Sequence, residues 1–241
     1  MSGFCSARFD TAFHAAAANW SAWRRDYNWE KAWQDRPLLT CEHLFSRFCN
    51  EYNLARNIPG DPTEKNAKRR REKAERRKKV VMNYLRTHSI PEVPAELDNY
   101  ATKGFLTAVN SATEDLPELP VKSKDSGMNK ESQKVAPSIS LFSKVACFAF
   151  PARIPPIDRL NKAALENPTQ YADFHQRFME RHDWLWNTVK ERNIKMLPPS
   201  FIAKYHYNDT ELGVPTAFRM RITDNYLTLE GSKKLRKAHA K

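Results

Sequence analysis

Glycine is scarce in this chain, with six among 241 residues, and no apolar run approaches the length of a membrane span. A transmembrane helix needs about 20 consecutive apolar residues, so none is expected. The opening MSGFCSARFDTAFHAAAANW has no basic segment followed by an apolar core and a cleavage site, so we expect a cytoplasmic protein that is not secreted. Few glycines and little strand-like alternation also argue against a β-sandwich or an α/β sheet with glycine-rich turns.

Cysteine pairs at the spacing of metal ligands are also absent. The four cysteines stand far apart, and no two have the CxxC spacing of zinc sites, iron–sulfur clusters or redox dithiols. We therefore expect no metal cluster and no cofactor, and reduced thiols at Cys5, Cys41, Cys49 and Cys147.

Apolar residues recur at intervals of three and four along most of the chain. This is the period of amphipathic helices, and it predicts a mainly α-helical fold. We expect a helical region over 1–114, a polar linker or loop over 115–137, a second helical region over 138–230 and a frayed or mobile basic tail over 231–241.

Positive charge is concentrated in two places. Lys and Arg number 40 against 28 Asp and Glu, a net charge of +12. The segment Lys65–Lys79 carries ten basic and two acidic residues, and the tail adds five basic residues, which leaves the rest of the chain nearly neutral. Two cationic elements on a neutral body favour an anionic partner such as nucleic acid.

The first cationic element is predicted to form a long helix over 62–88. Asp61 suits the N-cap position and Pro62 the first helical position. Apolar residues come only in the last third, so the rest is expected to be exposed or to lie against a polyanion. A merely solvated face is the alternative. The residues of this helix expected to contact DNA are Lys68, Arg69, Arg70, Arg71, Arg76 and Arg77. If these six residues neutralise six phosphates, the logarithm of the binding constant should fall with the logarithm of the salt concentration with a slope of roughly −5.

The segment Ser138–Leu165, SISLFSKVACFAFPARIPPIDRLNKAAL, contains the residues most suggestive of chemistry. Lys144 lies in an apolar helix, and Asp158 follows a proline-stiffened turn fourteen residues later. A desolvated amine can attack a sugar carbon and form a Schiff base, and a carboxylate can stabilise the developing positive charge. In the structural alternative Asp158 is only an N-cap and Lys144 only a solvated side chain.

This segment resembles the helix-hairpin-helix DNA glycosylase superfamily, and within it the 8-oxoguanine glycosylase-like branch. The resemblance implies a multi-helix bundle that acts on double-stranded DNA. It also implies that Lys144, at the N-terminal end of its helix, is the nucleophile and that Asp158 assists it. A looser likeness to bacterial relatives of unknown role extends to the closing AFRMRITDNYL. The matching residues are Lys144-Val145-Ala146-Cys147 and Pro156-Ile157-Asp158.

Two features depart from that family. Serines and apolar residues replace the glycines that normally precede the lysine and let backbone amides approach a DNA phosphate. The interval from lysine to aspartate is also shorter, which requires a tighter turn. Hydroxyls and N–H groups at a helix N-terminus can still bind a phosphate. The residues of this region expected to contact DNA are Ser138, Ser140, Ser143, Arg153, Arg159 and Lys162.

A glycosylase must also flip its target base out of the duplex into a pocket. Aromatic side chains near the motif and on a later helix are candidates for its walls, with ordinary core packing as the alternative. These residues are Phe148, Phe150, Trp184 and Trp186.

The sequence thus leads to a DNA glycosylase, acting as a monomer, with or without abasic-site lyase activity. Its substrate is expected to be an oxidised purine, or a hypermodified pyrimidine of phage DNA in an antiviral defence role. Two alternatives stay open. One is a non-catalytic DNA- or RNA-binding protein on the same scaffold, and the other is a helical structural or interaction protein.

Overall fold

The computed structural model describes residues 3–27, 42–51, 66–110, 138–194 and 214–239. Within these ranges the chain forms helices and no strand, which confirms the mainly helical fold. The predicted linker over 115–137 lies outside the described residues, as do Asp61 and Pro62.

The chain divides into two compact units. Unit 1 comprises Met1–Trp29 and Ser143–Lys241, and unit 2 comprises Glu30–Phe142. This division differs from the expected one, because the N-terminal helix groups with the C-terminal half rather than with the basic helix. The reason is long-range aromatic packing between the two ends of the chain, which the local pattern does not reveal.

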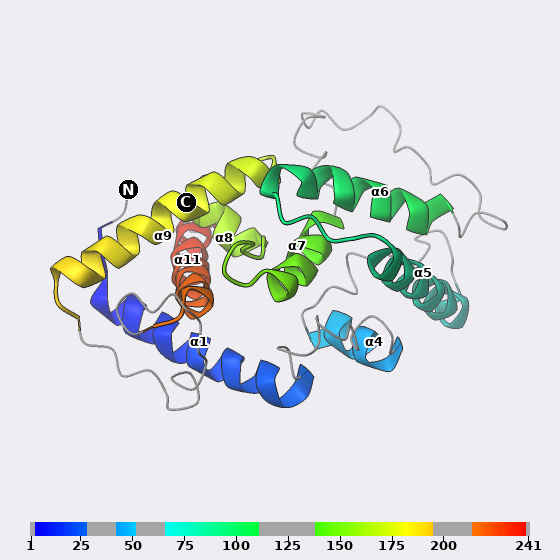
Figure 1. Cartoon of the computed structure of the whole chain (residues 1–241), viewed down its shortest axis with the longest axis horizontal. Helices are drawn as coiled ribbons and strands as arrows, with labels where there is room; N and C mark the ends of the chain where they lie inside the picture. The colour runs from blue at the N-terminus through cyan, green and yellow to red at the C-terminus, as the bar shows by residue number, and fades with distance from the viewer. Residues whose placement is uncertain (1–2, 28–41, 52–65, 111–137, 195–213, 240–241) are drawn as a thin grey trace. The chain divides into compact units, whose positions relative to one another are not determined.

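Unit 1 is built around the C-terminal helix α11, which packs against α1, α8 and α9 (Figure 1). Phe218 on α11 is fully buried and receives the edge of Trp20 from α1 at 5.4 Å between ring centroids. Each such buried aromatic contributes roughly 1.5–3 kcal/mol. The helices of this unit are α1 (Ser6–Tyr27), the greater part of α7 (Ser138–Ala149), α8 (Arg159–Ala164), α9 (Tyr171–Glu191) and α11 (Thr216–His239).

Helix α11 extends through the segment that was expected to fray. Gly231 lies buried inside it, and a Cβ placed there would collide with the backbone carbonyl of Leu160 on α8. Beyond it, Lys234 donates a hydrogen bond from Nζ to the carbonyl of Ala164 at 2.7 Å. The prediction of a mobile tail over 231–241 is therefore wrong as far as His239, because packing against α8 holds this turn in helical form.

Unit 2 contains α4 (Glu42–Glu51), α5 (Ala67–Thr87), the short 3-10 helix η2 (Pro94–Glu96), α6 (Leu97–Asn110) and the first five residues of α7. Tyr84 of α5 donates a hydrogen bond to the Tyr100 carbonyl at 3.2 Å and meets Phe142 edge-on. Gly104 on α6 faces the rings of Tyr84 and Phe142, where a Cβ would be crowded. This aromatic contact is part of the core of the unit.

The basic helix α5 begins later than the sequence predicted. Asn66 has an extended backbone and caps the helix by accepting hydrogen bonds from the N–H groups of Lys68 and Arg69. An asparagine in this role satisfies amides that have no partner inside the helix. Helix α5 thus starts at Ala67 rather than at Pro62.

Candidate functional site

The turn between α7 and α8 leads from the helix that carries Lys144 to Asp158, and Ser143 is the first residue that holds it in place. Ser143 is fully buried, and its hydroxyl accepts a hydrogen bond from the Ile157 N–H at 3.1 Å. Ile154 and Ile157 in the same connection are also buried. The serine that was expected to face a phosphate therefore holds the turn from inside unit 1.

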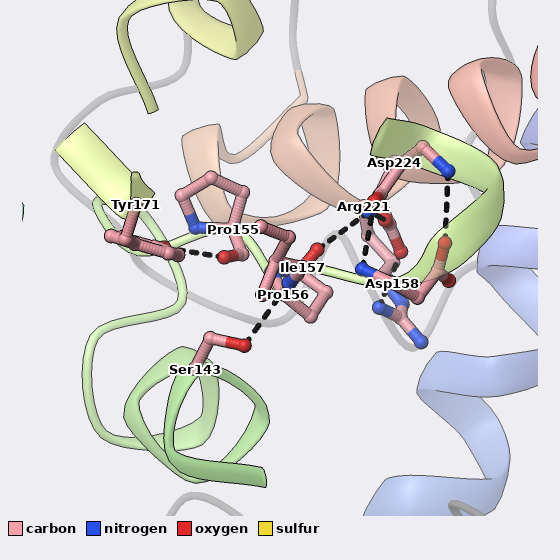
Figure 2. Close-up of polar contacts among 9 residues, drawn as sticks. Ser143, Pro155, Pro156, Ile157, Asp158, Tyr171, Arg221 and Asp224 are labelled. Atoms are coloured by element: carbon pink, nitrogen blue, oxygen red, sulfur yellow. Dashed lines mark hydrogen bonds and ion pairs between the residues drawn. The ribbon is translucent and has the colours of Figure 1, made fainter. Parts of the chain in front are cut away.

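Two further bonds fix the prolines of this turn. The Tyr171 hydroxyl donates to the Pro155 carbonyl at 2.5 Å, and Nδ2 of Asn161 donates to the Pro156 carbonyl at 2.6 Å. Figure 2 shows Ser143 and Tyr171 reaching the turn from separate elements. Proline removes backbone donors and restricts φ, so a turn held at both proline carbonyls has little freedom.

Asp158 ends the turn as the N-cap of α8. Its Oδ1 accepts hydrogen bonds from the N–H groups of Leu160 and Asn161, both at 2.8 Å, while Oδ1 of Asn161 accepts one from the Asp158 N–H at 2.8 Å. This reciprocal arrangement is a capping box. Both bonds to the carboxylate end on Oδ1, so the cap leaves Oδ2 available.

A second carboxyl group, Asp224, meets this turn from α11 (Figure 2). It is buried, and it accepts hydrogen bonds from Nη1 of Arg221 at 2.7 Å and from Nδ2 of Asn161 at 3.1 Å. Burial raises the pKa of Asp224 to about 6, with the Arg221 charge opposing the shift. The Asp158 charge raises this pKa further, and the Lys144 charge lowers it.

The charges of Lys144 and Asp158 therefore both act on one buried carboxyl group. Lys144 is half-buried and stands in the middle of α7, not at the N-terminal end that the family resemblance implies. The structure thus links Asp158 to the buried Asp224 through Asn161, and the charge of Lys144 also acts on Asp224.

The aromatic residues proposed as pocket walls occupy different surroundings. Trp186 is buried, donates from Nε1 to Thr223 at 3.3 Å and packs against Phe9, so it belongs to the core of unit 1. Phe148 is also buried. Phe150 and Trp184 are half-exposed, and the guanidinium carbon of Arg181 lies 4.0 Å from the Trp184 ring centroid.

The polar residues expected to contact phosphates differ in exposure. Arg153 and Arg159 are exposed, and Lys162 and Ser140 are partly exposed. Ser138 is the first residue of α7, and its side chain lies outside the described part.

On α5, which belongs to unit 2, four of the predicted cations are exposed: Lys68, Arg69, Arg71 and Arg76. The side chains of Arg70 and Arg77 are among those not described. Lys78 is buried instead, with Nζ 2.6 Å from Glu75 and 3.2 Å from the Ser46 hydroxyl. The basic run therefore has one buried cation among its exposed ones.

The described residues include no group of three or more His, Cys, Asp or Glu side chains that could hold a metal ion. The described cysteines Cys5, Cys49 and Cys147 are free thiols, and Cys41 lies outside the described part. Burial raises the pKa of both Cys49 and Cys147 to about 12, so neither is a ready thiolate nucleophile. No helix within the described ranges has the length and apolar character needed to cross a membrane.

Sequence reasoning missed Asn161, Arg221 and Asp224. Asn161 follows a predicted helix start, and its type and position do not distinguish it there. Arg221 and Asp224 lie in the segment AFRMRITDNYL, whose only signal in the sequence is a loose likeness to bacterial relatives of unknown role. The i,i+3 spacing of Arg221 and Asp224 suits an ion pair on one helical face. No local sequence pattern, however, connects Asp224 to Asn161, which lies 63 residues earlier.

Comparison with protein-family models, curated proteins and solved structures finds no match.

Proposed function

We propose that the protein is a DNA glycosylase that excises a modified base through Lys144 and Asp158. The observation that carries this proposal is the position of Asp158, which caps α8 fourteen residues after Lys144 of α7 and is linked through Asn161 to the buried Asp224. A helix-hairpin-helix bundle is the scaffold that this function predicts, and the mainly helical fold is compatible with it.

Lys144 is proposed as the nucleophile. Its half-buried position limits hydration of the side chain. Lys144 first gives up its proton to solvent, and the neutral amine then attacks C1′ of the target nucleotide. The glycosidic bond breaks, and the base leaves with the bonding electrons and takes up a proton. Loss of a proton from nitrogen and opening of the sugar ring then give a Schiff base, which water hydrolyses to an abasic site.

Asp158 is proposed to stabilise the positive charge that develops on the sugar as the base departs. Its Oδ1 serves the helix cap, and Oδ2 is the atom that would face the reacting sugar. A carboxylate held by a capping box is preorganised, because it needs no reorientation when charge develops. One side chain can thus serve the fold and the chemistry together.

Double-stranded DNA is the proposed partner. Within unit 1, the exposed Arg153 and Arg159 flank the turn that ends at Asp158, so they are suited to contact the backbone of a bound strand. The target base is proposed to be an oxidised purine, or a hypermodified pyrimidine of phage DNA in a defence role. A cytoplasmic monomer is proposed for either substrate.

Helix α5 supports the second candidate, a non-catalytic protein that binds DNA or RNA. The exposed side chains of Lys68, Arg69, Arg71 and Arg76 extend over about two turns, a density suited to a phosphate backbone. In that case Asp158 is a helix cap and nothing more, and binding depends on salt without any release of a base.

The test incubates the protein with duplexes that each carry one modified base, 8-oxoguanine or a glucosylated hydroxymethylpyrimidine. Abasic sites are then measured, and covalent adducts are trapped with borohydride. Asp158→Asn should reduce base release about 100-fold or more, while Asn still caps α8. Lys144→Gln should abolish the adduct. Matched controls are Asp10→Asn and Lys190→Gln, which change exposed residues of unit 1.

Three results would decide between the candidates. Base release that needs Asp158 but not Lys144 indicates an enzyme that uses water as its nucleophile. Equal activity of Asp158→Asn and the wild type overturns the proposed role of the carboxylate. Tight, steeply salt-dependent binding without base release from any duplex favours the binding protein.

A further inference from the structure

We propose that Asp224 is a positioning residue for Asp158, acting through the side-chain amide of Asn161. This inference rests on the proposed glycosylase function and assigns that site a residue that does not touch substrate. It follows from the hydrogen bonds that connect α11 to the turn before α8.

Asp224 accepts a hydrogen bond at each of its carboxylate oxygens. Oδ2 receives Nη1 of Arg221 at 2.7 Å, and Oδ1 receives Nδ2 of Asn161 at 3.1 Å. An ionised carboxylate is an acceptor at both oxygens, so it suits two donors at once. A neutral amide or a protonated carboxyl group in its place would turn a donor toward one of them.

The bond from Asn161 to Asp224 determines which way the Asn161 amide points. With Nδ2 directed at Asp224 and at the Pro156 carbonyl, Oδ1 is directed at the Asp158 N–H, 2.8 Å away. If the amide turned over, Nδ2 would face the Asp158 N–H and two acceptors would lose their donor. Ionised Asp224 therefore fixes the amide, and the amide fixes the backbone from which the Asp158 carboxylate projects.

The charges around Asp224 come from three parts of unit 1. Arg221 lies on its own helix, Lys144 and the Cys147 thiol come from α7, and Asp158 comes from the turn. The two cations and two carboxylates balance when both acids are ionised. Because burial raises the pKa of Asp224 to about 6, this balance is lost within the range in which DNA enzymes are assayed.

The experiment uses the full chain and a duplex with one abasic site, so that the identity of the modified base is not needed. The Lys144 amine condenses with the C1′ aldehyde and releases water, and borohydride reduces the resulting imine to a stable amine. The adduct rate with protein in excess, and the Kd for the same duplex, are measured between about pH 5 and about pH 8.

We expect the Asp224→Asn adduct rate to fall about 10- to 100-fold with little change in Kd, because the defect is one of orientation. The adduct rate of the wild type should fall as the pH drops through about 6. The adduct rate of Asp224→Asn should not show this fall. Asp10→Asn is the matched control and should behave as the wild type. If Asp224→Asn and the wild type have the same adduct rate and pH dependence, the inference is overturned, but the proposed function is not.

A second measurement does not depend on whether the variant folds. In the wild type, the side-chain amide signals of Asn161 should titrate in an ¹⁵N NMR spectrum with a midpoint near the pKa of Asp224, about 6. Amide signals that stay constant across this range would overturn the inference even if the adduct forms. If the wild type forms no adduct, the lysine chemistry of the proposed function fails, and the inference falls with it.

Discussion

Two ion pairs of nearly equal length, one in each unit, differ greatly in how far their side chains are exposed to solvent. In unit 1, Arg181 and Glu230 meet at 2.8 Å with side chains only 7% and 6% exposed. In unit 2, Lys79 and Glu42 meet at 2.9 Å with side chains 59% and 55% exposed. Distance alone would rank these pairs as equals, but burial separates them.

The same contrast runs through the two candidate sites. Near Asp158 the side chains of Arg221 and Asp224 are only 12% and 8% exposed, and hydrogen bonds hold Asp158, Arg221 and Asp224 in place, as a site for chemistry requires. On α5, most of the described basic side chains face water, as a surface that exchanges counterions for phosphates requires. The arrangement in unit 1 is suited to hold reacting groups in a defined geometry. The arrangement on α5 is suited to attract phosphates through its positive electrostatic field.

The largest effect is expected where a buried pair loses one partner. Glu230→Gln should lower the free energy of unfolding by about 3–5 kcal/mol, because the buried Arg181 and the partly buried Arg8 then lose the charge of the Glu230 carboxylate. Glu42→Gln should cost at most about 0.5 kcal/mol, since its pair is exposed. Urea denaturation followed by circular dichroism measures both, and equal costs would remove the contrast between the units.

Glycine replacement probes the packing of each unit. Gly231→Ala places a Cβ against the backbone of Leu160, which cannot rotate away, so we expect a loss of about 3 kcal/mol. Gly104→Ala meets the rings of Tyr84 and Phe142, and these side chains can shift, so we expect about 1 kcal/mol. Thermal unfolding of the two variants tests this ranking, which a lower Tm for Gly104→Ala would reverse.

The pH dependence of stability tests the buried charge of Asp224. Because burial raises its folded pKa from 3.8 to about 6, the folded state binds more protons than the unfolded state between these values. Stability from this group is therefore present at low pH and lost as pH rises through about 6. Relative to Asp224→Asn, the wild type should lose up to about 3 kcal/mol between about pH 4 and about pH 7. A constant difference in unfolding free energy across this range would contradict the assignment.

Local signals in the sequence predicted the parts of the site that depend on neighbouring residues. Prolines followed by Asp158 marked the start of α8, and the apolar period around Lys144 marked α7, because capping and amphipathicity act over a few residues. The contact from Asp224 to Asn161 spans 63 residues, and no local pattern encodes such a pairing.

The errors in the fold have two different origins. Gly231 suggests a helix end when it is considered alone, and the structure places it at a close approach of α8 and α11, where only glycine fits. The start of α5 was misplaced because Asp61-Pro62 is a strong capping signal, yet Asn66 provides the cap. Tertiary packing in one case and a competing local cap in the other decided the outcome.

The smallest expected effect separates the two roles of Asp158 most sharply. Asp158→Ala removes the acceptor for the Leu160 and Asn161 amides and should cost about 1 kcal/mol of stability, whereas Asp158→Asn keeps a capping oxygen and should cost only a few tenths. If Asp158 is only a cap, function should follow stability, and the alanine variant should be the worse of the two. If its charge also serves base excision, both variants should lose base release to a similar extent although only one loses stability. Unfolding curves and base-release rates measured on the same preparations distinguish these patterns, and an asparagine variant that is both stable and fully active would leave Asp158 with the structural role alone.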